Sequence, residues 1–397
     1  MTPEGRRPLP PEFALPLAPC NSAVSRCSVS REAATQRILI MRLGAYGDIL
    51  MGTPLLAALR RAYPHAHLTW LVERNAREAI DASPHIDELI LWKSNYWRKA
   101  LRKGSRLLSP VWAWRARGFR QQLAQKPFDV FISFQPEEWP LLTPDIGAAQ
   151  SIGVFDTFRQ FYGHTQTSLH TRLYDTAYAF PHLPAHRTDQ YLLPLGALGL
   201  PPTGDKQMRM GFTADDRDFA ALFLARHGVS PAERLVVVAP FTTWAARCWP
   251  AARFAALGDT LARQECRIVL IGSAKERPAV EALAAQMTHA PIVAAGSLGF
   301  RALAALISQA ALVVSGDTGP MHVAAAVGTP FVALFGPTPT PELAPLAGGG
   351  TLLRHDVPCG PCSQKVCPNT GEDHMRCMKL ITVDEALRAA RQTLAAA

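Results

Sequence analysis

ALVVSGDTGPMHVAAAVGTPFVALF, residues 311–335, is the stretch that decides the fold of this chain. It begins with the apolar run Ala311–Ser315, passes through a loop into small apolar residues, and turns at Gly328. A second apolar run, Phe331–Phe335, follows. Short apolar runs joined by a helix-sized segment are typical of parallel strands that are buried on both faces. The stretch therefore predicts a β-α-β unit of Rossmann type.

The alternation continues outward through the rest of the second half, and Phe331–Phe335 is expected to be its last strand. Further strands and helices are predicted at Leu235–Pro240, Pro250–Arg263, Arg267–Gly272, Lys275–Met287, Ile292–Ala295 and Phe300–Gln309. The first half repeats the pattern less clearly, with a turn and helix over Gly44–Tyr63 and another helix between its second and third strands. Its strands are predicted at Arg37–Arg42, His67–Val72, Asp87–Trp92 and Phe128–Phe134.

We predict an α/β chain with two Rossmann-like domains, at 37–200 and 201–397, that face each other across a cleft. The stretch Pro194–Asp205 is rich in proline and glycine and is the predicted linker. Residues 1–36 contain six prolines and no apolar periodicity, which predicts a disordered extension rather than a signal peptide. Because ligands bind at the carboxyl ends of strands in open α/β sheets, the chemistry should lie on the loops that follow the strands.

Composition agrees with a globular protein and limits its location. Of 397 residues, 48% are hydrophobic and 18% are charged, and the net charge of +9 suits an acidic partner. Charged or polar residues interrupt every apolar run well before the roughly 18 residues that a membrane span needs. We therefore expect a cytoplasmic protein, whose scattered cysteines Cys20, Cys27, Cys248 and Cys266 are free thiols.

The loop after the first strand runs from Arg42 to Asp48, and its glycines Gly44 and Gly47 permit close approach of the backbone. Asp48 stands at the start of a helix. Its carboxylate is a candidate general base that takes a proton from an incoming hydroxyl. The alternative is an N-cap aspartate that binds the amides of the first turn. The loop lacks the G-x-G-x-x-G pattern, which argues against a dinucleotide site and a NAD-dependent oxidoreductase.

Two loops of the second half carry groups that suit phosphate. In the loop after Ala311–Ser315, Asp317, Thr318 and Gly319 precede a helix whose free amides favour an anion, although Asp317 or Thr318 is also a candidate cap. His322 is either a phosphate-side contact or a packed helical residue. The loop after Leu235–Pro240 contributes Thr242, Thr243 and Arg247, which together can neutralise a diphosphate. The alternative there is a hydrophobic staple on Trp249 with a surface arginine. A carboxylate on one half and two phosphate-binding loops on the other suit sugar transfer with departure of a nucleoside diphosphate.

Three segments together resemble glycosyltransferase family 9, the bacterial heptosyltransferases. They are RLGAYGDILMGTPLLAALRRAYP (42–64), APFTTWAARCWPAARFAAL (239–257) and VSGDTGPMHVAAAVGTPFVALFGPTPT (314–340), and the similarity runs from about Arg37 to the C-terminus. The resemblance implies the GT-B fold and an inverting mechanism that needs no metal or other cofactor. It implies ADP-heptose or a related nucleotide sugar as donor, and the lipopolysaccharide core or a similar membrane-linked glycan as acceptor.

The resemblance also assigns roles to residues. Asp48 resembles the catalytic base, while Thr242, Thr243, Thr318 and Gly319 match phosphate contacts, and Asp317 and His322 match the same donor loop. Glu276 matches a carboxylate that holds the donor ribose. Arg247 stands where family members often have lysine, and Phe241 replaces a smaller residue. A planar guanidinium in place of an ammonium changes how the leaving group is held. Two alternatives stay open: a nucleotide-sugar epimerase of the same fold and a non-catalytic binding protein.

Two further features lie outside these loops. Between Lys93 and Lys126 there are ten basic and no acidic residues, with interleaved aromatics. Arg98, Arg102 and Arg106 are therefore predicted to bind an anionic membrane surface or an acidic acceptor, which would place the protein peripherally on the cytoplasmic face of the inner membrane. A solvated basic helix is the alternative, and no recognised module favours nucleic acid.

Near the C-terminus, Cys359, Cys362, Cys367 and Cys377 form C-x2-C-x4-C-x9-C. This spacing is a candidate structural zinc site, and the alternative is that the cysteines only pack the loop.

Overall fold

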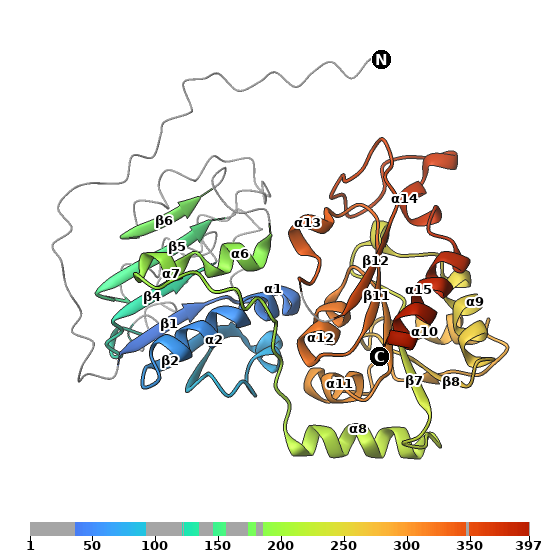
Figure 1. Cartoon of the computed structure of the whole chain (residues 1–397), viewed down its shortest axis with the longest axis horizontal. Helices are drawn as coiled ribbons and strands as arrows, with labels where there is room; N and C mark the ends of the chain where they lie inside the picture. Colours follow the sequence, from blue (N-terminus) through green and yellow to red (C-terminus); the bar gives the residue numbers. More distant parts are fainter. Residues whose placement is uncertain are drawn as a thin grey trace, which may run out of the picture. The chain divides into compact units, whose positions relative to one another are not determined.

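The computed structural model describes residues 36–92, 121, 123–134, 146–155, 174–179, 186–346 and 349–396. Its described residues contain two parallel sheets of six strands each, with helices packed on them (Figure 1). The predicted α/β class is therefore confirmed. Residues Gln36–Ala397 form one compact unit. The predicted extension, apart from Gln36, lies outside the described residues.

The first sheet has the strand order β3-β2-β1-β4-β5-β6. Its strands are β1 (Arg37–Met41), β2 (His67–Glu73), β3 (Glu88–Trp92), β4 (Val130–Ser133), β5 (Gln150–Phe155) and β6 (Thr176–Ala179). β1 lies centrally, where Ile38 pairs with Leu68 on one side and Val130 on the other. Side chains on both faces of β1 are buried, which explains why this strand has no polar alternation.

The second sheet repeats this plan with the order β12-β11-β10-β7-β8-β9. Its strands are β7 (Arg234–Ala239), β8 (Cys266–Leu270), β9 (Ile292–Val293), β10 (Leu312–Gly316), β11 (Phe331–Phe335) and β12 (Gly350–Arg354). The expectation that Phe331–Phe335 is the last strand is wrong, because β12 follows it and pairs with β11 along its whole length. All strands of the second sheet follow residue 201 and those of the first precede residue 200, while the domain boundaries themselves stay predictions.

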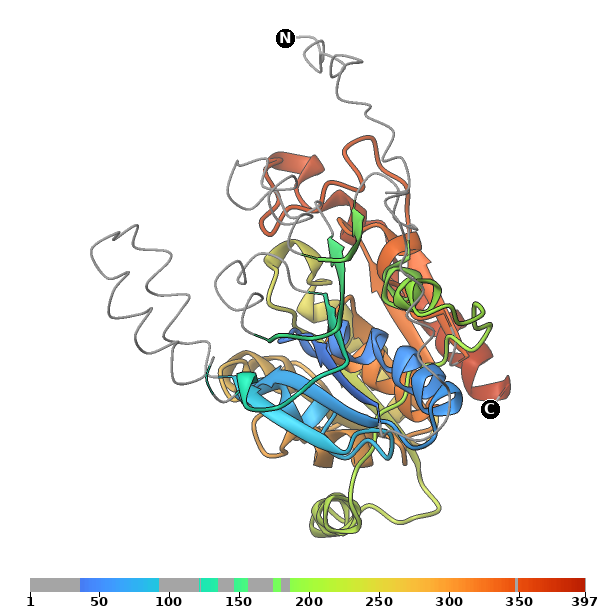
Figure 2. The same cartoon turned by 90° about the vertical axis from the view of Figure 1, so that its left-hand side faces the viewer.

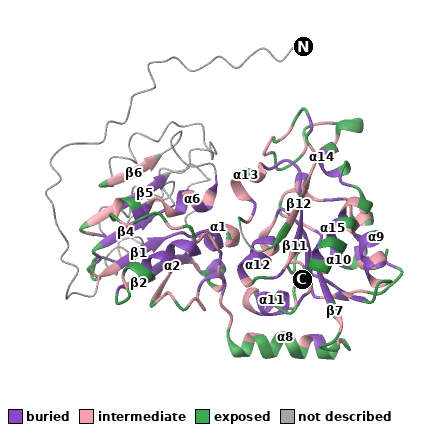
Figure 3. Cartoon of the chain, viewed as in Figure 1, coloured by how far each residue is buried: buried purple, intermediate pink, exposed green. Residues whose placement is uncertain are grey.

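Helices cover both faces of the second sheet. One face packs against α8 (Ala214–Arg226), α11 (Phe300–Ile307) and α12 (Gly319–Val327), through residues such as Val237 and Val313. The other packs against α9 (Ala251–Ala262), α10 (Arg277–Ala284) and α15 (Val383–Ala396), through residues such as Val236 and Val314. α8 contacts α11 and lies at the lower edge in both views (Figures 1 and 2). It is largely exposed, whereas α12 is mostly buried (Figure 3).

The predicted helix Gly44–Tyr63 is divided in the structure into α1 (Tyr46–Met51) and α2 (Thr53–Ala62). Pro54 explains the break, because a proline nitrogen has no hydrogen to donate to the carbonyl of Leu50. The Thr53 hydroxyl donates to that carbonyl instead, at 2.7 Å. The helix expected between the second and third strands is a 3-10 helix, η2 (Arg74–Ala79).

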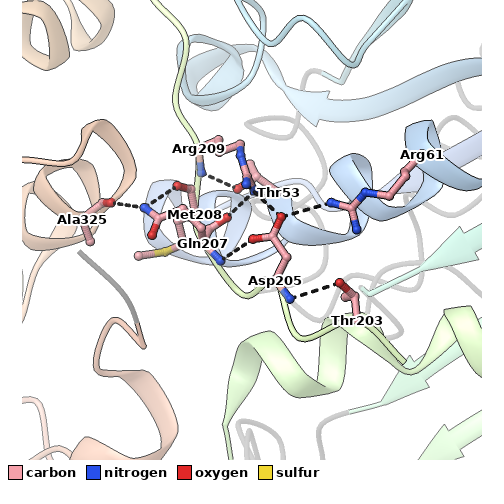
Figure 4. A network of polar contacts seen from close by, with 8 residues as sticks. All are labelled: Thr53, Arg61, Thr203, Asp205, Gln207, Met208, Arg209 and Ala325. Carbon is pink, nitrogen blue, oxygen red and sulfur yellow. Dashed lines mark hydrogen bonds and ion pairs between the residues drawn. The ribbon is translucent and has the colours of Figure 1, made fainter. Parts of the chain in front are cut away.

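The segment that connects the two sheets forms hydrogen bonds with α2 of the first half and with α12 of the second (Figure 4). Part of the predicted linker is helical, in α7 (Pro194–Ala197), which follows α6 (Arg187–Leu192). Further along, Asp205 forms ion pairs with Arg61 and Arg209 at 3.3 and 2.8 Å. The Arg209 amide donates to the Thr53 hydroxyl of α2 at 2.8 Å, and the Gln207 side chain donates to the carbonyl of Ala325 in α12 at 2.8 Å.

The remaining helices are short and lie in the second half. They are η6 (Ala245–Arg247), α13 (Thr340–Leu343), η7 (Gly371–Asp373) and α14 (Arg376–Lys379). Within the described ranges, no helix has both the length and the apolar character needed to cross a membrane.

Candidate functional site

The loops that follow β1 and β10 meet where α1 packs against α12. The contact depends on Gly47, since a Cβ atom built there would lie 2.6 Å from Cδ2 of His322. No real side chain tolerates such a separation, so glycine is what allows the two helix starts to approach. Asp48 and the start of α12, predicted from separate halves of the sequence, are thereby brought together.

Asp48 is buried, with 9% of its surface exposed, and is the third residue of α1. Its Oδ2 atom accepts a hydrogen bond from the Ala45 amide at 3.2 Å and lies 2.6 Å from Nη2 of Arg42. The N-cap of α1 is Ala45, so the interpretation of Asp48 as the N-cap itself is wrong. The carboxylate supports the first turn from inside the helix and is at the same time paired with a buried cation.

Arg247, which is largely covered, and the buried Asp317 form a second pair. Nε of Arg247 lies 3.1 Å from Oδ2 of Asp317, and Nη1 donates to the Asp317 carbonyl at 3.4 Å. The guanidinium also stacks on the Trp244 ring, with 3.7 Å from Cζ to the ring centroid. Burial lowers the pKa of Arg247, while the charges of Asp317 and Asp48 oppose that shift. Arg247 is therefore not the surface arginine of the alternative interpretation, and Asp48 is close enough to act on it.

His322 lies at the centre of these charges and is 5% exposed. Burial lowers its pKa, against the raising effect of Asp317 and Asp48, and His186 and Arg247 add to the lowering. Its Nδ1 atom is buried and has no hydrogen-bond partner among the described residues. The packed and the ligand-contact interpretations therefore both hold in part, because the ring is packed against Gly47 and still has an unused polar atom.

The start of α12 has the features of an anion site. Thr318 is its N-cap, but neither Thr318 nor Asp317 caps the helix with its side chain in this part of the structure. Nothing lies within 4 Å of a Cβ atom built on Gly319, so there is open space in front of the first turn. Uncapped amides beside open space favour a phosphate oxygen, and α12 directs the positive end of its dipole toward it.

The Thr242 loop lies against β10. The Thr242 hydroxyl donates to the carbonyl of Trp244 at 2.8 Å and accepts from its amide at 3.2 Å, which fixes the loop. Its methyl carbon would lie 3.1 Å from a Cβ atom on Gly316, so it is adjacent to the Asp317 loop. Thr243 is exposed. Trp249 is a core residue whose Nε1 donates to the Ile381 carbonyl at 2.9 Å.

Glu276 lies at the carboxyl end of β8, the strand next to β7, but it does not touch the residues described above. It is the N-cap residue of α10, and its Oε2 atom accepts a hydrogen bond from the Ser273 amide at 2.7 Å. Its place at the same edge of the sheet agrees with the predicted role in ribose binding without testing it.

Three residues of this region were missed by the sequence analysis as site residues. Arg42 pairs with Asp48. His186 is buried, donates from Nε2 to the Ala344 carbonyl at 2.7 Å, and accepts at Nδ1 from the Thr188 amide at 3.1 Å. Thr338, in the loop after β11, has a buried hydroxyl without a partner among the described residues. The FGPT sequence that follows β11 could have indicated Thr338, whereas no local pattern indicates His186.

Two sets of predicted residues remain apart from the site. Arg98, Arg102 and Arg106 lie outside the described residues. Cys359, Cys362, Cys367 and Cys377 are free thiols, and burial raises the pKa of Cys377. Among the residues that the structure describes, no three His, Cys, Asp or Glu side chains are grouped so that they could hold a metal ion. Zinc binding by the cysteines stays a prediction without structural support.

A cavity of about 730 Å³ lies elsewhere, at the amino ends of β7 and β8, where Arg234 and Cys266 contribute to its lining. This is the edge of the sheet opposite to the loops that carry Thr242 and Asp317. Because ligands in open α/β sheets bind at the carboxyl ends of the strands, we assign the site to the loops rather than to this cavity.

Comparison with known proteins shows which proteins this chain resembles. A sequence model of glycosyltransferase family 9 (heptosyltransferase) matches residues 117–372. Lipopolysaccharide heptosyltransferase 1 of Pseudomonas aeruginosa is 28% identical over 344 residues, which cover 83% of this chain and 87% of that protein. A family 9 glycosyltransferase structure from Veillonella parvula has a TM-score of 0.76 at 24% identity, over 92% of this chain and 99% of that one. Heptosyltransferase WaaC of E. coli, solved with ADP, has a TM-score of 0.67 at 22% identity, over 90% and 100% of the two chains. The structural likenesses show the same GT-B arrangement of two sheets.

Proposed function

This chain belongs to glycosyltransferase family 9, the heptosyltransferases, and from that premise we propose that it transfers a heptose from ADP-heptose to a lipopolysaccharide core or similar membrane-linked glycan, with inversion at the anomeric carbon. The observation that carries this proposal is the contact of Gly47 with His322. It joins a buried carboxylate from the first half to an uncapped helix start from the second. Transfer to a hydroxyl needs both a base and an anion site, at neighbouring positions.

On the acceptor side, Asp48 is the base in the proposed reaction. An acceptor hydroxyl attacks the anomeric carbon while Asp48 removes its proton, and the bond from that carbon to the diphosphate oxygen breaks. The electron pair leaves with the ADP. Attack on the face opposite to the leaving group inverts the configuration, and Asp48 later releases its proton to solvent.

On the donor side, the groups around α12 stabilise the departing diphosphate. Nothing lies within 4 Å of a Cβ atom on Gly319, and the exposed Thr243 belongs to the loop whose Thr242 lies next to Gly316. Arg247 adds a cation whose direction is set by Asp317 and Trp244. Fixed donors and charges of this kind act without reorganisation when charge develops on the leaving group. Glu276 is the proposed ribose contact, and the reaction is proposed to need no metal or other cofactor.

ADP-heptose is supported as the donor by the relatives. The WaaC structure contains ADP, and a second structure of the same enzyme, with a TM-score of 0.63, contains ADP-2-deoxy-2-fluoro heptose. The relative from Pseudomonas aeruginosa is named a lipopolysaccharide heptosyltransferase, which supports the acceptor class.

The direct test is transfer from ADP-heptose to a heptose-deficient lipopolysaccharide, measured by mass spectrometry for the wild type and for Asp48→Asn. Loss of a general base lowers the rate by about 10²–10⁴-fold, so we expect that decrease with ADP binding retained. Asp218→Asn, an exposed position on α8, is the matched control and should keep full activity. Full activity of Asp48→Asn would disprove the assignment of the base. Conversion of the donor in the absence of an acceptor would instead identify an epimerase, and binding without turnover would identify a binding protein.

We further propose that the basic segment docks the enzyme on the cytoplasmic face of the inner membrane. The support is its composition, in which Arg98, Arg102 and Arg106 lie among aromatic residues. Each cation near an anionic surface contributes about 1 kcal/mol, so reversing all three charges should weaken binding to phosphatidylglycerol vesicles by at least tenfold. Unchanged binding to vesicles and to the lipopolysaccharide acceptor would contradict this proposal.

A further inference from the structure

Arg42 is a buried cation in direct contact with the proposed base. It directly follows β1, and only 7% of its surface is exposed. Its Nη1 atom donates to the Phe134 carbonyl at 2.8 Å, and its Nη2 atom lies 2.6 Å from Oδ2 of Asp48. The side chain is thus held at one nitrogen by the end of β4 while the other nitrogen reaches α1.

Aromatic side chains exclude water around this pair. Tyr191 lies 5.8 Å from the guanidinium carbon and packs edge-on against Phe134, with 4.6 Å between ring centroids. The Trp70 indole donates to the backbone carbonyl of Arg42 at 3.1 Å, which fixes the backbone from which the arginine extends. Charges interact more strongly in such surroundings than in water, so the pair is stronger than a surface ion pair.

We propose that Arg42 is a positioning residue for Asp48, which holds the carboxylate in the orientation and the ionised form in which it accepts the proton of the acceptor hydroxyl. The inference rests on the proposed function of Asp48 as the base. It gives a role to a residue for which the sequence analysis proposed none.

The chemistry of the guanidinium suits this role. Its planar fork allows one nitrogen to be anchored on a carbonyl while another binds the carboxylate, and it stays charged at every working pH. A lysine has a single nitrogen and would have to share it between Phe134 and Asp48. The Ala45 amide binds the same carboxylate oxygen at 3.2 Å, so the two donors together define its direction.

Other charges near Asp48 come from the second half of the chain. Arg247 and His322 interact electrostatically with Asp48, and Asp317 with both of them, and these residues lie in two loops and in α12. Burial lowers the pKa of His322 and so disfavours its charged form, and Asp317 is paired with Arg247. Arg42 is the cation in direct contact with the Asp48 carboxylate, so its removal should move the acid limb of the rate profile upward.

The experiment compares Arg42→Gln and Arg42→Lys with the wild type in transfer assays from pH 5 to 9. Arg42→Gln should lower kcat by about 10–100-fold and shift the acid limb upward by about 1 pH unit or more, because an adjacent cation lowers a carboxyl pKa by about 1–3 units. Arg42→Lys keeps the charge, so its acid limb should stay close to the wild type while kcat falls less. The KM for the donor and the Kd for ADP should change by less than about twofold, since the contacts through which Arg42 holds Asp48 are made with β4 and α1 and not with the phosphate loops.

A matched control separates this role from a purely structural one. Arg60 also binds backbone carbonyls and pairs with a carboxylate, that of Asp87 at 2.6 Å, without contacting Asp48. Arg60→Gln should reduce stability but leave the acid limb unchanged. In an Asp48→Asn background, Arg42→Gln should cause no further loss of kcat, because the two residues act as one unit.

The outcomes distinguish this inference from the proposed function. If Asp48→Asn is inactive but folded Arg42→Lys and Arg42→Gln keep the wild-type kcat and pH profile, Arg42 has no positioning role. If Arg42→Gln does not fold, Arg42→Lys alone decides, and a kcat equal to the wild type overturns the inference. Full activity of Asp48→Asn would reject the base itself, whatever Arg42 does.

Discussion

At the scale of single residues, the candidate site is built from charges that are buried and paired. Arg42 forms an ion pair with Asp48, and Arg247 forms one with Asp317. A buried ion that loses its partner destabilises a protein by about 3–5 kcal/mol. Replacing either member of a pair alone should therefore destabilise the protein. His322 interacts with Asp48, Asp317 and Arg247, and burial lowers its pKa. The site therefore holds its charges in place before any substrate arrives.

Gly47→Ala tests the contact on which the site depends. The added Cβ would lie 2.6 Å from His322, and both α1 and the buried ring would have to move apart. Small shifts of catalytic groups cost about 100-fold, so we expect kcat/KM to fall by about 10–100-fold in the transfer assay. Gly204→Ala is the control, because nothing lies within 4 Å of a Cβ there. Equal activity of the two variants would show that the contact is not needed.

The buried histidines predict how stability depends on pH. Burial lowers the pKa of both His322 and His186, so in the unfolded chain they take up protons near pH 6.5 that the folded protein does not accept. The unfolded state then binds more protons, and the free energy of unfolding falls as pH decreases below about 6.5, by up to about 1.4 kcal/mol per pH unit for each histidine.

Urea unfolding between pH 5 and 7.5 measures this slope. His322→Asn should make it shallower, whereas His65→Asn, at an exposed histidine, should leave it unchanged. A slope that is the same in both variants would rule out His322 as its source.

At the scale of elements, neighbours decide what local sequence leaves ambiguous. β12 begins with glycine, a residue that is rare in strands. The strand lies at the exposed edge of the sheet, so its sequence lacks the continuous apolar run that marks a buried strand. Its place is explained by Phe331 of the adjacent strand, whose ring would lie 2.0–2.5 Å from a Cβ on Gly350. The aromatic ring covers the space above the glycine, so the strand pairs where a larger residue would not fit.

Gly350→Ala should therefore destabilise the protein. Phe331 is 1% exposed and cannot swing into solvent, so overpacking should lower the free energy of unfolding by about 1–3 kcal/mol. Urea denaturation gives this value directly. The double variant with Phe331→Leu should recover part of the loss, because the smaller side chain leaves room for the methyl group. If the losses in free energy of unfolding of the two single variants simply add in the double variant, the Phe331 ring is not the cause.

At the scale of the whole molecule, the described residues from both sheets share one hydrophobic cluster. Ile40 and Leu55 of the first half belong to it together with Val313 and Ala324 of the second. The connecting segment adds directed bonds to this cluster, since it binds α2 through Thr53 and α12 through Ala325 (Figure 4). Further polar contacts join the halves at α11, where Glu78 accepts from the Phe300 amide at 2.6 Å.

Thr53→Val tests this connection without changing the size of the side chain. The hydroxyl donates to Leu50 and accepts from the Arg209 amide, so its loss leaves buried backbone groups without partners. We expect the free energy of unfolding to fall by about 1–3 kcal/mol in urea. Thr260→Val removes a half-exposed hydroxyl from α9 and should change it by less than about 0.5 kcal/mol. A loss in Thr53→Val no larger than in this control would refute the role of the connection.

The sequence by itself determined the α/β class and the central strands of both sheets, and it predicted the loops of the candidate site. Each depends on a short window of residues: apolar runs without alternation indicate buried parallel strands, and glycines or helix starts after them indicate the functional edge. The three motifs also predicted the family to which the chain belongs. The sequence pattern did not predict β5 and β12, because strands at or near the edge of a sheet have fewer apolar residues in sequence.

The tertiary structure alone decided how the side chains of the site pair. Arg247 lies 70 residues from Asp317, and the carbonyl that anchors Arg42 lies 92 residues away from it. Such contacts depend on which strands become neighbours and on how closely two helices approach, and neither is encoded in a local period. His186, which no pattern indicated, is placed by the same assembly. Local physics predicted where the chemistry lies, and the packing of distant segments determined which charges meet there.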